Sequence, residues 1–165
     1  MKFFSYIPLA ILLAITAHQA KAQTSVYGTA MLTAFDNRAA GGFTAGAFYN
    51  FHTPSRLTAG IDGRVSYAPG NKGGNAELAA LRISFIPRKN PLRPYLQIGG
   101  GVVSQNSYNT FRRTNGAAEI AFGLDIRLTD NLDVRAFDYG AAAGSRYGAG
   151  FGFLNVGIVY HFHQN

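Results

Sequence analysis

Apolar and polar residues alternate one by one along most of this chain, which is the period of a β-strand and not of a helix. The alternation is clearest over 56–67. There Leu57, Ala59, Ile61, Gly63, Val65 and Tyr67 share one face, and Arg56, Thr58, Gly60, Asp62, Arg64 and Ser66 share the other. Seven further segments repeat the pattern: 25–36, 43–52, 79–85, 95–104, 117–128, 132–141 and 152–163. The sequence therefore predicts eight strands.

Turn-forming residues separate these strands. The segments 36–42, 68–75, 105–116 and 142–151 are rich in such residues, and we expect them to be long loops. The segments 53–55 and 129–131 are short. The segment 87–94 holds Pro87, Pro91 and Pro94, which cannot donate to a strand ladder, so we expect a turn there. Long and short connections thus alternate, with the proline-rich turn as the exception.

The composition indicates where such strands would lie. Only 14% of the residues are charged although 47% are hydrophobic, and the mean hydropathy is near zero. This is fewer charges than a soluble domain usually carries, and the apolar residues are too dispersed for membrane-spanning helices. Strands with one face in lipid explain both observations. The chain has no cysteine, so we expect a fold held without disulfides.

The first 22 residues have the pattern of a cleaved signal peptide. Lys2 precedes a short apolar run over 3–17, and Ala20-Lys21-Ala22 has the form of a cleavage site. The run is shorter than the roughly 20 residues that a membrane-spanning helix needs. We therefore expect export, with one mature domain over 23–165.

The last predicted strand carries a resemblance to a known family. Asn155, Gly157, Tyr160 and Phe162 have the spacing of the C-terminal assembly signal of bacterial outer-membrane β-barrels. In that family the final aromatic usually ends the chain, whereas this chain continues through 163–165. Together with the strand count, the loop alternation and the signal peptide, the mature chain resembles the small eight-stranded barrels of Gram-negative outer membranes, such as the membrane domain of outer-membrane protein A.

The resemblance implies an all-β, eight-stranded, antiparallel up-and-down transmembrane barrel with both termini in the periplasm. It also implies three partners: outer-membrane lipid, lipopolysaccharide and the barrel-assembly machinery. A structural or surface-recognition role through the extracellular loops follows from the same resemblance. Two alternatives stay open, a narrow porin and a soluble periplasmic barrel that binds an apolar ligand inside, as lipocalin-like folds do. A lipocalin-like barrel should have its apolar face inside and its charges outside.

Charged residues on the mixed face are predicted to fill the lumen. These are Asp62, Arg64, Arg82, Glu119, Asp125, Arg127, Asp133 and Arg135. An eight-stranded barrel has an interior just wide enough for side chains, so we expect ion pairs and no open path. A three-residue turn that sets Leu128 opposite Leu132 also sets Arg127 opposite Asp133, and Asp125 opposite Arg135.

The remaining candidate chemistry is sparse. His52, His161 and His163 are expected at the periplasmic rim as interfacial polar residues, so we predict no metal, cofactor or catalytic site. Some barrels of this size modify lipids with a serine and a histidine at the extracellular end, which no histidine after residue 22 reaches. The predicted loops hold cations that could bind lipopolysaccharide phosphates or another polyanion: Arg38, Lys72, Arg112, Arg113 and Arg146. The other reading is a solvated basic rim, and the pI of about 9.9 does not require nucleic acid as a partner.

Overall fold

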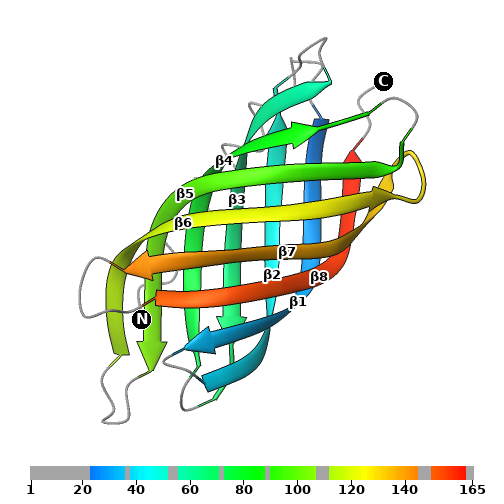
Figure 1. Ribbon diagram of the computed structural model, residues 1–165. Helices are drawn as coiled ribbons and strands as arrows, with labels where there is room; N and C mark the ends of the chain where they lie inside the picture. Colours follow the sequence, from blue (N-terminus) through cyan, green and yellow to red (C-terminus); the bar gives the residue numbers. More distant parts are fainter. Residues whose placement is uncertain are drawn as a thin grey trace.

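The computed structural model describes residues 23–35, 38–51, 56–70, 73–87, 90–106, 112–144 and 150–162, and the expected signal peptide lies outside them. Eight strands follow one another along the chain (Figure 1). They are β1 (Gln23–Phe35), β2 (Arg38–Asn50), β3 (Leu57–Ala68), β4 (Gly74–Phe85), β5 (Leu92–Asn106), β6 (Arg112–Arg127), β7 (Leu132–Gly144) and β8 (Gly150–Phe162). Within the described ranges there is no helix long and apolar enough to cross a membrane.

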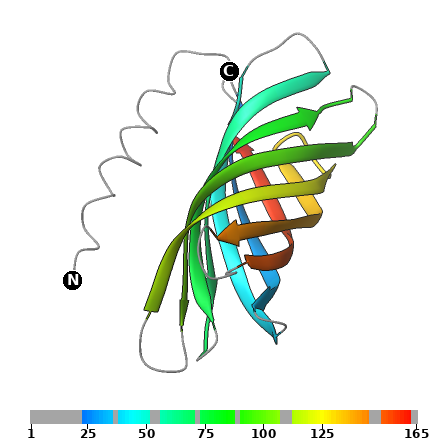
Figure 2. The same cartoon turned by 60° about the vertical axis from the view of Figure 1, so that its left-hand side comes forward.

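Each strand pairs antiparallel with its neighbours in sequence, and β1 pairs with β8 to close a barrel. The predicted all-β, eight-stranded, antiparallel fold is therefore confirmed. The strands cross the wall obliquely (Figure 2). Paired residues followed once around the barrel from Gln23 lead back to β1 at Thr33. This offset of about ten residues is the shear of the barrel, and with eight strands it leaves room inside only for side chains.

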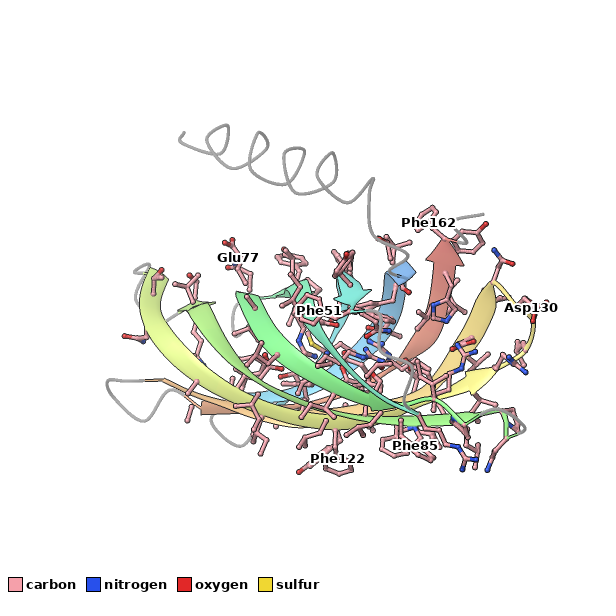
Figure 3. All side chains as sticks on the ribbon, turned by 90° about the horizontal axis from the view of Figure 1, so that it is seen from above. Phe51, Glu77, Phe85, Phe122, Asp130 and Phe162 are labelled. Atoms are coloured by element: carbon pink, nitrogen blue, oxygen red, sulfur yellow. The ribbon has the colours of Figure 1, made fainter. Side chains whose placement is uncertain are left out.

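The apolar face of the strands points outward. Large hydrophobic side chains are exposed around the wall, among them Leu81 at 66% and Ile158 at 57%. Figure 3 shows Phe85, Phe122 and Phe162 projecting away from the barrel. The charged face is turned inward and buried, as in β3, where every second residue is buried. This is the reverse of the arrangement expected for a lipocalin-like barrel.

The strands extend further into the predicted loops than the sequence pattern indicates. The connections at the end of the barrel opposite the termini, here called the loop end, are 36–37, 69–73, 107–111 and 145–149. At the terminal end, where β1 begins and β8 ends, the connections are 51–56, 86–91 and 128–131. The predicted alternation of long and short connections is therefore wrong. The glycine and polar residues at the loop end, which the sequence assigns to loops, belong to strands. Pairing with the neighbouring strand satisfies their backbone hydrogen-bonding groups.

Pro94 was wrongly assigned to the turn 87–94, because β5 begins at Leu92 and includes it. The β4–β5 pairing ends at Ser84 and Tyr95, whereas Pro94 pairs with Leu124 on β6. One edge of β5 is thus unpaired at Pro94. A proline is tolerated where its missing N–H faces an unpaired edge.

An irregularity in β7 changes which side chains face inward. The register with β6 shifts between Leu124 and Asp125, and the register with β8 shifts between Arg135 and Asp138. A bulge inserts one residue against its partner strand. Asp133 and Arg135 are therefore buried on one side of the bulge, and Asp138, at the opposite parity, is buried on the other.

Three inward glycines leave space for aromatic rings to lie against the wall. A Cβ built on Gly46 would lie 2.4 Å from the ring of Tyr27. A Cβ on Gly123 would lie 2.3 Å from the ring of Tyr95, and one on Gly140 would lie 2.5 Å from Phe153. These glycines are required by packing, since any side chain there would displace a buried ring.

We expect Gly123→Ala to lower the free energy of unfolding by about 1–3 kcal/mol, because the new methyl group overpacks Tyr95 and the backbone oxygen of Phe137. Gly63→Ala is the matched control, since its Cβ would meet nothing within 4 Å on the outer face. The control should change stability by less than about 0.5 kcal/mol. The measurement is reversible urea unfolding in lipid vesicles, and equal effects of the two variants would contradict the packing.

Candidate functional site

The barrel interior has two parts. From the middle towards the loop end it is filled by an apolar plug. Its members are Met31, Ala68, Ala76, Leu78, Val103, Ala121, Ala142, Phe151 and Phe153. From the middle towards the terminal end it is filled by a network of buried charged and polar side chains. The sequence predicts the charges but not the plug.

Arg64 on β3 holds the middle of this network. Its Nη1 donates to Asp138 Oδ2 at 2.9 Å, and its Nη2 donates to Gln97 Oε1 at 2.9 Å and to Glu119 Oε1. The guanidinium also lies 5.0 Å from the ring centroid of Phe153, a member of the plug. One arginine thus joins four strands and connects the polar half of the interior to the apolar half.

Asp125 on β6 joins the next two arginines. Arg135 donates to it from Nε at 2.9 Å, and Arg82 donates from Nη2 at 2.8 Å. Arg82 Nη1 also lies 3.7 Å from Asp62 Oδ2, while the Tyr27 hydroxyl donates to the other oxygen of Asp62 at 2.8 Å. Every one of these groups is buried.

The arginines are stacked on aromatic rings as well as paired with acids. Arg82 lies between two rings, 3.9 Å from the centroid of Phe48 and 3.7 Å from that of Tyr95. Arg135 lies 4.1 Å from the centroid of Tyr27. Contact with the ring faces is favourable for a guanidinium. Ring and guanidinium together fill the cross-section of the barrel at this level.

A second cluster lies at the terminal end. Asp133 Oδ2 accepts from Arg93 Nη1 at 2.9 Å and lies 2.8 Å from His161 Nε2. His161 Nδ1 lies 2.6 Å from Ser25 Oγ. His161 is 3% exposed, so it is an interior residue near the terminal end and not the interfacial polar residue that the sequence predicts. The predicted pair of Arg127 with Asp133 is also replaced: the register is the predicted one, but Arg127 is exposed and Arg93 reaches Asp133 instead.

Ser25, His161 and Asp133 have the residue types and contacts of a nucleophilic triad. Ser25 is 0% exposed, so a substrate carbonyl has no approach to its Oγ while the barrel is closed. The three residues therefore act as a cross-link, joining β1, β8 and β7 at the seam where the barrel closes. The register between β1 and β8 in the closed barrel sets Ser25 opposite His161, a contact that the alternation along one strand does not show.

Seven of the eight predicted lumen charges are buried in the interior: Asp62, Arg64, Arg82, Glu119, Asp125, Asp133 and Arg135. Sequence reasoning missed three members of the network. Arg93 was assigned to a turn, Asp138 has its parity reversed by the bulge, and His161 was placed at the rim. Only His161 shared a face with inward residues in the sequence pattern.

The four residues of the assembly motif are split between the two faces of β8. Asn155 is buried and donates to Asp138 Oδ2 at 3.0 Å. Gly157 has no room for a side chain, since a Cβ there would lie 2.2 Å from the Gly28 oxygen. Tyr160 and Phe162 face outward with ring centroids 5.1 Å apart.

The basic residues predicted to bind anions fall largely outside the described part of the chain. Lys72 and Arg146 lie outside it, as do His52 and His163. Arg38 begins β2 and Arg112 and Arg113 begin β6, all at the loop end, but their side chains are not among those described. Among the side chains that are described, no three of the His, Asp and Glu type are arranged to hold a metal ion.

Known structures share this fold. Neither a protein-family model nor a curated protein matches the sequence. Neisserial surface protein A aligns with a TM-score of 0.56 and 14% identity, over 87% of this chain and 98% of that one. The N-terminal barrel domain of OprF from Pseudomonas aeruginosa aligns with a TM-score of 0.58 and 16% identity, over 87% and 98%. Ail, the attachment invasion locus protein of Yersinia pestis, aligns with a TM-score of 0.54 and 15% identity, over 86% and 97%. The chain therefore has the fold of the small eight-stranded outer-membrane barrels.

The replacement of Arg127 by Arg93 as the partner of Asp133 is tested by two double-mutant cycles. Asp133→Asn should lower the free energy of unfolding by about 3 kcal/mol, because it leaves the largely buried Arg93 guanidinium without its acid. Arg93→Ala should be strongly coupled to it in refolding experiments in detergent. Arg127→Ala, the matched exposed control, should change stability by less than about 0.5 kcal/mol and show no coupling to Asp133→Asn. Coupling to Arg127 and not to Arg93 would refute this pairing.

Proposed function

We propose that this chain is an integral outer-membrane barrel with a closed lumen, and that it has a structural or surface-recognition role exercised at the loop end. Its fold and its outward aliphatic face support a position in a bilayer. The predicted signal peptide and the assembly motif support export and insertion by the barrel-assembly machinery. In this orientation the terminal end faces the periplasm and the loop end faces the exterior.

The filled interior is the observation that carries the closed lumen. Arg82 and its two stacked rings occupy the half towards the terminal end, and the buried side chains of the plug occupy the half towards the loop end. A narrow porin would need a wet path through both. We therefore favour a barrel that does not conduct over the narrow porin.

A role as an enzyme is not favoured. The one constellation of nucleophile, base and acid in the described interior has its serine fully buried at the periplasmic end. Its contacts explain how the seam of the barrel is held. We propose no cofactor, because the ion-pair network is balanced largely by its own side chains.

The basic residues at the loop end are the proposed recognition elements. Arg38, Arg112 and Arg113 open strands there, and Lys72 and Arg146 lie in connections at the same end. Arginine binds phosphate with directed hydrogen bonds, so lipopolysaccharide phosphates are the proposed ligands. The chain's formal net charge is +7, or +5 once Lys2 and Lys21 leave with the expected signal peptide, and a positive charge is in keeping with an anionic partner.

The closed lumen predicts that the pure protein shows no steady conductance in planar bilayers. Insertion must be verified in the same preparation, by the shift of the folded band on boiling before electrophoresis. Stable ion-conducting openings of correctly inserted protein would favour the porin instead.

The recognition role predicts that Arg112→Glu with Arg113→Glu weakens binding to lipopolysaccharide micelles. A basic residue near an anionic surface contributes about 1 kcal/mol, so the double variant should lose at least about tenfold in affinity at low salt. Arg56→Glu with Arg127→Glu is the control, since both residues are exposed at the other end and the change in net charge is the same. Equal losses in the two variants would indicate attraction by net charge alone and would contradict recognition at the loop end.

A further inference from the structure

The described side chains of the interior contain one more acid than arginine. The carboxylates are Asp62, Glu119, Asp125, Asp133 and Asp138, and the arginines are Arg64, Arg82, Arg93 and Arg135. His161 is the remaining base, and it contacts Asp133 at the terminal end. An unbalanced charge in such a closed interior is strongly unfavourable. One proton must therefore be held, either by an acid or by His161.

The contacts show which acid lacks a cation of its own. Asp133 is paired with Arg93, and Asp125 with Arg135. Arg82 donates to Asp125 and is the cation beside Asp62. What remains is Arg64, which is shared between Asp138 and Glu119.

Asp138 is the better-bound partner of Arg64. Its carboxylate accepts from Arg64 Nη1 at 2.9 Å and from Asn155 Nδ2 at 3.0 Å. Each of the two acids has one buried oxygen without a hydrogen-bond partner, Asp138 Oδ1 and Glu119 Oε2, but Glu119 accepts from Arg64 alone. Glu119 is 3% exposed, so solvent does not compensate for that missing bond.

Glu119 also stands at the border of the apolar plug. Ala121 is the next inward residue on β6, and Ala142 on β7 is the register partner of Glu119. Both alanines are members of the plug. The other charged and polar groups that face it belong to the network: Arg64 and Asp62 on β3, Gln97 on β5 and Asp138 on β7. A second full negative charge at this position would lie against apolar side chains.

We propose that Glu119 holds this proton in the closed barrel, and that its loss loosens the apolar plug and admits water from the loop end. The neutral carboxyl keeps Arg64 paired with Asp138 and adds no charge beside the plug. Ionisation transfers the proton to solvent and leaves two carboxylates competing for one guanidinium. The barrel thereby carries a pH-sensitive plug, independent of what its loops recognise.

Infrared spectra of the refolded protein test the charge state directly. At neutral pH the protein should show the C=O stretching band of a protonated carboxyl group, and Glu119→Gln should remove it. Glu77→Gln, at an exposed glutamate on β4, is the matched control and should leave the band in place. If the band is absent, Glu119 is ionised, the proton belongs to His161 and the proposal fails. If the band is present but unchanged in Glu119→Gln, another acid of the network holds the proton and the proposal fails as well.

Stability and opening test the consequence. Glu119→Gln should unfold at nearly the wild-type urea concentration at neutral pH, whereas Asp138→Asn should unfold at a clearly lower one. As the pH is raised from neutral, the protection of plug amides against hydrogen exchange, corrected for the intrinsic pH dependence of exchange, should fall in the wild type and not in Glu119→Gln. An equal fall in protection in both proteins, or no fall in either, would show that the plug does not respond to Glu119. Lipopolysaccharide binding plays no part in either readout, so failure here is separate from failure of the proposed recognition role.

Discussion

Closure of eight strands with a shear of about ten residues is the constraint on which the rest of this structure depends. Closure removes both sheet edges, so every strand forms backbone hydrogen bonds with two neighbouring strands. It also makes the interior so narrow that inward side chains from opposite walls touch. A charged residue on the inner face therefore is not solvated, and it is tolerated only when it pairs with another side chain across the barrel. The network around Arg64 and Asp125 is a consequence of that geometry.

Glycine, aromatic ring and guanidinium solve this packing problem together. A ring that lies against the wall needs a position without a side chain beneath it, as Tyr95 has at Gly123. The Arg82 guanidinium stacks on the same ring, 3.7 Å from its centroid. Arginine is suited to this role because its flat group stacks while its edges still donate to carboxylates. The interior is thus filled by layers of charged and polar side chains, in which some groups, such as the Tyr95 hydroxyl and Gln97 Nε2, have no hydrogen-bond partner in the described part of the chain.

The sequence was informative where the period of two was unbroken. The strand count, the outward aliphatic face and the register that sets Asp125 opposite Arg135 all follow from alternation and were found in the structure. The misassignments lie where alternation is interrupted or masked. A bulge reversed the parity at Asp138, a proline at an unpaired edge hid the start of β5, and glycine-rich strand ends resembled loops. The contact of Ser25 with His161 depends on closure between the first and last strands, which a local pattern does not show.

The two ends of the interior differ in a way that assigns them different tasks. At the terminal end, Ser25, His161, Asp133 and Arg93 tie four strands by directed contacts, including the seam between β1 and β8. Such contacts hold one register, because a slip of one residue would turn these groups to the outer face. At the loop end the plug consists of four alanines and five larger apolar side chains. Hydroxyl groups in the same half also make directed contacts, Thr44 with Ser66 at 2.8 Å and Ser104 with Thr114 at 2.7 Å. The end that fixes closure is therefore held by contacts among buried charged groups, while the end that carries the basic residues is held by apolar packing and neutral hydrogen bonds.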